Sequence, residues 1–149
     1  MPSAMSSDIV YLDTSALAKW YLNEPGSDAF VAYLKAVDVG IISSVTRVEM
    51  RSLLERRRRM AELDPALEAR LFAAFLRDFA NGDLSLYPVD DARYEVALQL
   101  IGTYPHHPLR TLDALHLGVA QHLGAACLAT ADAVMADAAR ALGFDVKRF

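Results

Sequence analysis

Four acidic side chains stand at positions where a folded chain could bring them together. Asp13 ends an apolar run, Glu49 lies in the first turns of an expected helix, and Asp113 lies in the first turn of another. Asp132 directly follows a later apolar run. In a parallel sheet, the carboxyl ends of the strands and the starts of the following helices share one edge. We therefore expect Asp13, Glu49 and Asp132 at that edge, with an irregular segment bringing Asp113 to it.

Carboxylates that converge without lysine or arginine partners repel one another, and proteins rarely bury unpaired charge. A hard divalent cation relieves this repulsion, because Mg²⁺ prefers oxygen ligands and binds a few carboxylates together with substrate phosphate. Such a site can deprotonate a bound water and offset charge on a phosphodiester during in-line attack. The four acids therefore predict a metal-dependent phosphodiesterase in which no side chain has to act as the nucleophile.

Each acid also has a purely structural interpretation. Asp13 and Asp132 stand where helix N-caps stand, and an acid in a first turn, such as Asp113, favours the helix dipole. Glu49 could lie on a solvated helix face. Taken one at a time, each acid favours a structural role, because caps and dipole partners outnumber catalytic acids, but the joint pattern of the four favours catalysis.

Other polar side chains lie close to these acids in the sequence. The hydroxyls of Ser15 and Thr130 are expected to bond the acids or metal-bound waters, or simply to cap helices. Arg110 precedes the Asp113 helix and is a candidate for positioning a substrate strand. His116 follows Asp113 by three residues on the same helix face, where it either orients substrate or a metal water, or packs as a hydrogen-bonded histidine.

Short apolar runs alternate with helical patterns along the chain. Strands are expected at 9–12, 40–43, 84–88 and 126–130, with a last edge strand at 144–146. This alternation predicts an α/β fold with a parallel sheet. The length of 149 residues, 54% of them hydrophobic, fits one domain with a substantial core.

The composition limits the functional classes. The net charge of −4 gives no general sign of nucleic-acid binding, so a partner with phosphates would need a local basic surface. The single cysteine, Cys127, cannot form an internal disulfide, which fits a reducing compartment. Residues 1–7 lack the basic and apolar parts of a secretory signal, and no apolar run reaches the roughly 18 residues of a membrane span. We expect a cytoplasmic protein with a disordered segment at 1–7 and no membrane association.

Four segments together resemble the PIN-domain ribonucleases, and most closely the VapC toxins of bacterial toxin–antitoxin pairs. They read VYLDTSAL at 10–17, TRVE at 46–49, LRTLDALH at 109–116 and LATAD at 128–132. The resemblance implies that residues 1–149 form a single PIN-like domain. The implied fold has three layers, with a central parallel sheet of four or five short strands flanked by about seven helices.

The same resemblance implies a function. It implies a Mg²⁺- or Mn²⁺-dependent endoribonuclease that inhibits translation, forms a homodimer in the cytoplasm and is silenced by a small antitoxin protein. The acidic quartet of the family falls on Asp13, Glu49, Asp113 and Asp132 of this sequence. These four residues are therefore the expected metal ligands and catalytic residues.

An arginine-rich stretch begins beside Glu49. Positions 47 to 59 hold six arginines and two glutamates in a chain that is acidic overall. Such a basic island could hold a nucleic-acid backbone or an acidic antitoxin segment, or form a solvated helix face, since arginine is a good helix former. We take Arg51, Arg56 and Arg59 as candidate contacts for RNA or antitoxin.

Apolar stripes predict which helix faces are buried. Phe72, Phe75, Leu76 and Phe79 follow helical spacing and are most simply core, although residues 45–81 could instead form a projecting hairpin with an apolar groove for a partner. Three other helices carry similar faces, made by Val45, Val48 and Leu53, by Leu112, Leu115 and Val119, and by Tyr94, Ala97, Leu98 and Ile101.

Three rival functions use a similar scaffold. A phosphatase with an aspartyl-phosphate intermediate would want a second acid two residues after Asp13, where this chain has Ser15. A phospho-acceptor receiver module needs paired acids after the first strand and a lysine late in the sheet, but Lys147 is almost the last residue. A non-catalytic binding module stays open as an alternative, although the intact acids argue against it.

Overall fold

The structure, a computed structural model, describes residues 9–149. Within that range the chain forms five strands and seven helices. The strands are β1 (Ile9–Leu12), β2 (Val39–Ser43), β3 (Ser85–Tyr87), β4 (Cys127–Thr130) and β5 (Asp145–Arg148). The helices are α1 (Thr14–Tyr21), α2 (Ser27–Lys35), α3 (Ser44–Arg59), α4 (Pro65–Ala80), α5 (Asp91–Thr103), α6 (Thr111–His122) and α7 (Ala133–Ala141). The segment 1–7, expected to be disordered, lies outside the described residues.

The five strands form one parallel sheet in the order β3-β2-β1-β4-β5. This confirms the predicted α/β fold with a parallel sheet. β1 lies at the centre and pairs with β2 on one side and β4 on the other, with Leu12 opposite Ala129. Because all strands run in one direction, the residues that follow β1, β2 and β4 lie at the same edge of the sheet.

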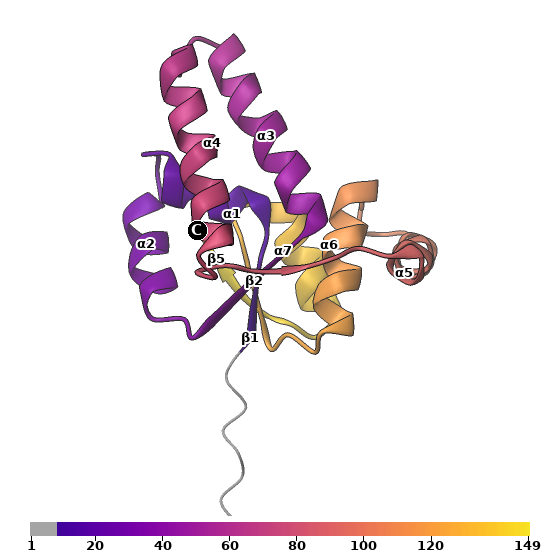
Figure 1. The fold of residues 1–149 in the computed structure, drawn as a ribbon. Coiled ribbons are helices and arrows are strands. Elements are labelled where there is room, and N and C mark those ends of the chain that lie inside the picture. Colours follow the sequence, from indigo (N-terminus) through magenta and orange to yellow (C-terminus); the bar gives the residue numbers. More distant parts are fainter. Residues whose placement is uncertain (1–8) are drawn as a thin grey trace, which may run out of the picture.

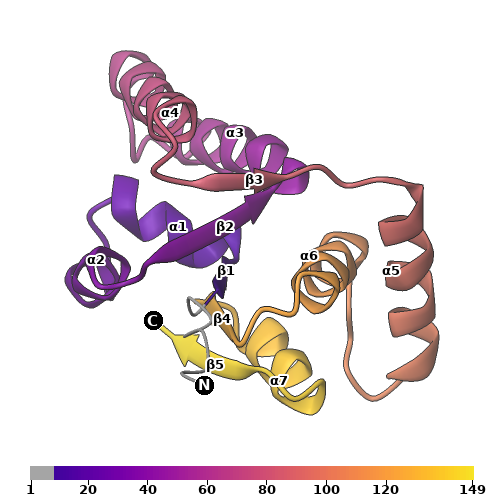
Figure 2. The same ribbon diagram turned by 60° about the horizontal axis from the view of Figure 1, so that its bottom comes forward.

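Helices cover both faces of the sheet, so the domain has three layers (Figure 2). α1 to α4 lie over one face, and α5, α6 and α7 lie over the other. Side chains alternate along β1, as the pleat requires: Val10 and Leu12 belong to the core under α1 to α4, whereas Tyr11 belongs to the core under α5 to α7. Both cores contain fully buried side chains, so the sheet edge rests on a rigid centre.

α3 and α4 lie side by side and extend away from the sheet (Figure 1). α4 begins with Asp64 as N-cap, whose carboxylate accepts from the backbone N–H of Leu67, and with Pro65 at the first helical position. Phe75 is fully buried, and Phe72 and Leu76 pack partly buried against the same core. Phe72, Phe75 and Leu76 of the stripe are therefore core, as their spacing predicts, whereas Phe79 is half-buried and lies under the guanidinium of Arg47.

Three predicted faces are only partly buried. Val48 of α3 is 72% exposed and Leu112 of α6 is 44% exposed, so both predictions of burial are wrong. In α5, Ala97 is buried but Tyr94 and Leu98 are more than half exposed. No helix within residues 9–149 is long and apolar enough to cross a membrane.

Candidate metal centre at the carboxyl edge of the sheet

The four acids line one cavity of about 420 Å³ at the carboxyl edge of the sheet. Asp13 directly follows β1, and its backbone N–H donates to the carbonyl of Ala129 on β4 at 2.9 Å. Glu49 comes from the second turn of α3, Asp113 from the first turn of α6, and Asp132 from the start of α7. The structure thus brings together four side chains that are separated by up to 119 positions in the chain.

Asp13 lies at the floor of the cavity and is only 6% exposed. It occupies the N-cap position of α1, but its side chain makes no capping hydrogen bond. Instead its Oδ2 accepts from the hydroxyls of Ser15 and Thr130, each at 2.8 Å. Ser15 and Thr130 therefore hold the carboxylate directly, which is one of the two roles expected for them.

Glu49 is held from two sides. Its Oε1 accepts from the hydroxyl of Thr14 at 2.9 Å and from Nε2 of His116, which donates because a carboxylate oxygen can only accept. Nε2 of His116 also lies 3.7 Å from Oδ1 of Asp13. His116 is 1% exposed, and its Nδ1 bonds the hydroxyl of Tyr11 at 2.5 Å. Of the described residues, Asp13, Glu49 and His116 bring three potential metal-ligating atoms within 4.8 Å of one another.

The environment moves the pKa values of these three groups in different directions. Burial raises the pKa of Asp13, although His116 and the two hydroxyls oppose it. Burial also acts to raise the pKa of Glu49, but the hydrogen bond and charge of His116 outweigh it and leave the pKa lowered. For His116, burial disfavours the charged ring, yet Glu49 and Asp13 raise its pKa overall. Of Asp13, Glu49 and His116, Asp13 is therefore the residue whose charged form the surroundings disfavour.

Asp113, Asp132 and Arg110 form a second group, called the outer part because it includes the exposed Arg110; the side chain of Asp113 itself is only 10% exposed. Arg110 is 76% exposed, and its guanidinium lies 3.3 Å from Oδ2 of Asp113 and 3.5 Å from Oδ2 of Asp132. Asp113 also accepts from the backbone N–H of Arg110 at 3.2 Å, which fixes the first turn of α6. Oδ1 of Asp132 caps α7 by accepting from two backbone N–H groups at 2.8 and 3.2 Å. Both acids therefore have structural partners as well as a place in the cavity.

The arginines of α3 divide between two environments. Arg56 lines the cavity and forms no ion pair with any residue in the range 9–149. Arg51 lies 4.9 Å over the ring of Phe72, and Arg59 lies 3.2 Å from Glu55. The structure therefore places Arg56 beside the acids, whereas Arg51 and Arg59 contact their own helical hairpin.

Sequence reasoning missed three supporting side chains. Thr14 bonds Glu49, and Tyr11 and Ser43 continue the hydrogen bonds behind His116. Thr14 follows Asp13 directly, so its small hydroxyl at a strand end was an available signal. Tyr11 is an ordinary strand residue by its pattern, and its partner His116 lies 105 positions away, which no local signal indicates.

The donor set fits a divalent cation. Four carboxylates line the cavity, and the cations near them are His116 behind Glu49 and the arginines Arg56 and Arg110 in the lining. Burial raises the pKa of Asp13 by more than His116 and the two hydroxyls lower it, so the charge of Asp13 is incompletely compensated. A bound divalent ion would supply the missing positive charge.

A family model described as the PIN domain matches residues 10–141, and the chain therefore belongs to the PIN-domain family. The chain is 39% identical over 140 residues to ribonuclease VapC46 of Mycobacterium tuberculosis, a match that covers 92% of this chain and 95% of that protein. The resemblance read from the four segments is thereby confirmed.

Solved structures share the fold over nearly the whole chain. VapC20 of Mycobacterium tuberculosis, described as a sarcin–ricin-loop-cleaving toxin, has a TM-score of 0.74 and 18% identity, covering 94% of this chain and 99% of that one. FitAcB from Neisseria gonorrhoeae has a TM-score of 0.68 and 20% identity, covering 92% and 95%. At such low identity the two structures are evidence for the fold alone, and they confirm the predicted PIN-like fold.

Proposed function

We propose that this protein is a divalent-metal-dependent endoribonuclease and the toxin of a toxin–antitoxin pair. One observation carries the proposal: Asp13, Glu49, Asp113 and Asp132 come from four separate segments and line one cavity at the carboxyl edge of a PIN-domain sheet. The 39% identity to a protein named ribonuclease VapC46 supports RNA as the substrate. By the chemistry of this class, the reaction is hydrolysis of a phosphodiester bond.

Mg²⁺ or Mn²⁺ is the proposed cofactor, held by Asp13 and Glu49 in the inner part and by Asp113 and Asp132 nearer the mouth. When bound, the ion supplies an activated water and offsets charge on the phosphate oxygens. Carboxylate oxygens are the ligands that both ions accept. No side chain of the cavity needs to form a covalent intermediate.

The chain's own residues orient the substrate and the ligands. Arg56 lines the cavity without an ion-pair partner and is the arginine best placed to hold a phosphate of the RNA strand. Arg110 can exchange its two exposed ion pairs for a phosphate, since such pairs contribute little in water. Ser15, Thr14 and Thr130 hold the inner carboxylates.

The proposed partner is a cognate small antitoxin protein, and the proposed effect of RNA cleavage in the cytoplasm is inhibition of translation. Several proteins of the same fold are described as complexes of VapB with VapC, among them VapBC from Salmonella typhimurium bound to DNA. In this chain, the exposed arginines Arg51 and Arg59 are candidate contacts for an acidic antitoxin segment. A buried free thiol, Cys127, is consistent with a reducing cytoplasm.

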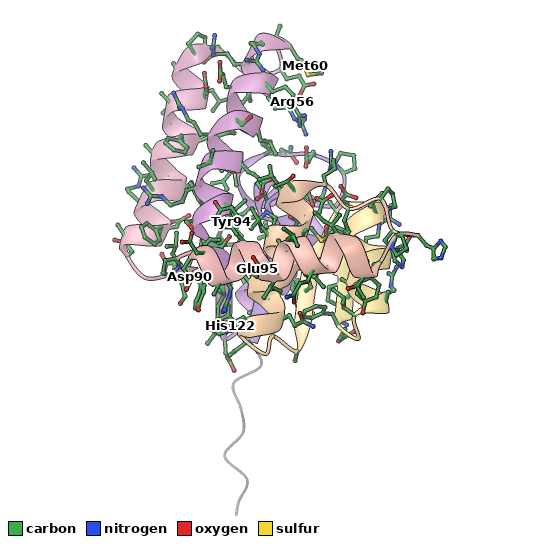
Figure 3. The ribbon with its side chains drawn as sticks, turned by 90° about the vertical axis from the view of Figure 1, so that its right-hand side faces the viewer. Arg56, Met60, Asp90, Tyr94, Glu95 and His122 are labelled. Carbon is green, nitrogen blue, oxygen red and sulfur yellow. The ribbon has the colours of Figure 1, made fainter. Side chains whose placement is uncertain are left out.

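We also propose a homodimer. Tyr94, Leu98 and Ile101 form an exposed stripe along α5 at 54%, 65% and 42% exposure. In Figure 3, α5 faces the viewer and Tyr94 is labelled. Beside the stripe, Val48 and Leu112 help to line a groove of about 380 Å³ that borders the metal cavity. An apolar surface of this kind is typical of a protein interface. A second copy of the chain is the proposed occupant.

The substitution Asp13→Asn tests the proposed activity. We expect loss of RNA cleavage with the fold retained, because the amide keeps the side-chain volume but is a poorer metal ligand. Asp28→Asn, an exposed acid on α2, is the matched control and should cleave like the wild type. Cleavage should also stop in EDTA and return with Mg²⁺ or Mn²⁺. Cleavage that persists in Asp13→Asn, or that ignores the chelator, would contradict the proposal.

A further inference from the structure

A chain of buried hydrogen bonds leads away from the metal cavity through the centre of the domain. The hydroxyl of Tyr11 on β1 donates to Oγ of Ser43 at the end of β2, at 3.0 Å. The same Tyr11 oxygen lies 2.5 Å from Nδ1 of His116 on α6, and Nε2 of His116 donates to Glu49 on α3. Two strands and two helices are therefore linked by three consecutive contacts that end on a proposed metal ligand.

The direction of these hydrogen bonds fixes the imidazole ring at both ends. Tyr11 has one hydroxyl hydrogen and donates it to Ser43, so its oxygen remains an acceptor for Nδ1 of His116. At the other end the carboxylate of Glu49 can only accept, so Nε2 carries a hydrogen. The ring thus has one orientation in which both nitrogens are satisfied, and it is packed edge-on against Tyr11 at 5.6 Å between ring centroids.

His116 stands behind the cavity wall. Tyr11 and Ser43 are 0% exposed and His116 is 1% exposed, and none of the three lines the cavity. Glu49 does line it, with a side chain 24% exposed. The hydrogen-bonded route from the buried groups to a bound ion therefore passes through the Glu49 carboxylate, while Nε2 of His116 also lies 3.7 Å from Oδ1 of Asp13.

We propose that Ser43, Tyr11 and His116 form a positioning chain that holds the Glu49 carboxylate in place as a ligand for the divalent cation. This inference rests on the proposed function, since it concerns the same metal site. Glu49 has a long flexible side chain that is 24% exposed, and fixing it before the ion arrives lowers the entropy cost of binding. Hydrogen-bond partners behind metal ligands commonly contribute 10- to 100-fold in metal affinity.

The test uses Mn²⁺ alone as the probe, with the full-length protein and free Mn²⁺ followed by electron paramagnetic resonance. His116→Leu removes both nitrogens and should weaken Mn²⁺ binding by about 10- to 100-fold. His116→Gln returns an N–H donor toward Glu49 and should recover part of that loss. Tyr11→Phe keeps the ring and removes only the hydroxyl, and should weaken binding by about 10-fold, the lower end of the range.

Tyr33→Phe is the matched control. It removes a half-buried hydroxyl that bonds the thiol of Cys127 at 3.3 Å, away from the cavity, and should leave Mn²⁺ affinity unchanged. RNA cleavage by Tyr11→Phe should approach the wild-type rate at saturating Mn²⁺, because the loss is in ion binding. A merely structural chain would lower thermal stability in the Tyr11 and His116 variants without moving Mn²⁺ affinity.

The possible results separate this inference from the proposed function. Wild-type protein that binds Mn²⁺ no better than Tyr11→Phe and His116→Gln would overturn the positioning chain and leave the metal site standing. Wild-type protein that binds no Mn²⁺ would overturn both. If His116→Leu fails to fold, the comparison of Tyr11→Phe with Tyr33→Phe decides the matter alone.

Discussion

Asp13 and Asp132 occupy equivalent places in the fold and are used differently. Each follows a central strand of the parallel sheet and stands at the N-cap of the next helix. Asp132 caps its helix with one carboxylate oxygen, whereas Asp13 caps nothing and points both oxygens into a network of hydroxyls and imidazole. A capping position alone therefore does not decide the role of an acid. The role depends on the partners of the carboxylate, which are helix backbone N–H groups for Asp132 and side-chain hydroxyls for Asp13.

The same contrast separates the inner and outer parts of the site. The inner part, Asp13, Glu49 and His116, is largely buried and held by short hydrogen bonds from residues that are themselves buried. The outer part, Asp113, Asp132 and Arg110, is held by an exposed guanidinium and by helix backbone. Buried hydrogen-bond partners hold the inner carboxylates, whereas ion pairs of an exposed guanidinium contribute little in water, so substitutions in the inner part should have larger effects.

The largest difference between the inner and outer parts is expected in the rate of RNA cleavage. Glu49→Gln should lower kcat/KM by about 10²-fold or more, because it removes a carboxylate ligand and leaves Nε2 of His116 without its charged acceptor. Asp132→Asn should lower it only by about 10-fold, since the amide oxygen can still cap α7. Asp137→Asn, an exposed acid of α7, is the control. Equal losses of kcat/KM in Glu49→Gln and Asp132→Asn would contradict a difference between the inner and outer parts.

Substitutions of the two inner acids, Asp13 and Glu49, should change the melting temperature in opposite directions. In EDTA at pH 7, Asp13→Asn should raise the melting temperature, because burial makes the ionised carboxylate unfavourable and raises its pKa. Glu49→Gln should lower it, because the hydrogen bond and charge of His116 outweigh burial and lower the pKa of Glu49. A change of about 1 kcal/mol moves the melting temperature of a domain this size by about 2–4 °C. Calorimetry of both variants measures the two shifts.

Lowering the pH should shrink both shifts. The penalty from Asp13 is fully present above its folded pKa, shrinks as the pH falls toward the ordinary value of 3.8, and vanishes below it, where both folded and unfolded chains are protonated. The stabilisation from Glu49 is present above its ordinary value of 4.5 and is lost as the pH falls through its lowered folded pKa. Shifts that stay constant from pH 7 down to the acid limit of folding would show that packing, rather than charge, causes them.

The sequence predicts the framework of this site better than its interior. Apolar runs identify the strands, and a parallel sheet then places Asp13 and Asp132 at one edge without further information. The roles of the four acids stay predictions until substitutions test them. The hydrogen bond from His116 to Glu49 joins residues 67 positions apart. It depends on how α6 packs against α3, and no local sequence pattern predicts it.

Helix faces show a second limit of sequence reasoning. Leu115 is buried and Leu112 is 44% exposed, although both follow the apolar spacing of one helix. Periodicity identifies an apolar face but does not say whether the core of the same chain or another molecule covers it. Val48 and Tyr94 lie beside Leu112 in the groove next to the metal cavity, which is why the same prediction fails for Val48.

Arg110 gives the smallest and most specific prediction. Arg110→Gln removes an exposed cation from Asp113 and Asp132, so its effect on the free energy of unfolding should stay within about 1 kcal/mol. If Arg110 exchanges its ion pairs for an RNA phosphate, the variant should bind RNA more weakly, and its plot of log affinity against log salt should be shallower by about 0.7 to 1. Arg140→Gln is the control, because Arg140 makes a similar exposed pair with Asp137 outside the cavity. Removing a contact with an RNA phosphate must change the number of counterions released on binding. An unchanged salt slope in Arg110→Gln would therefore show that Arg110 contacts only Asp113 and Asp132 and no RNA phosphate.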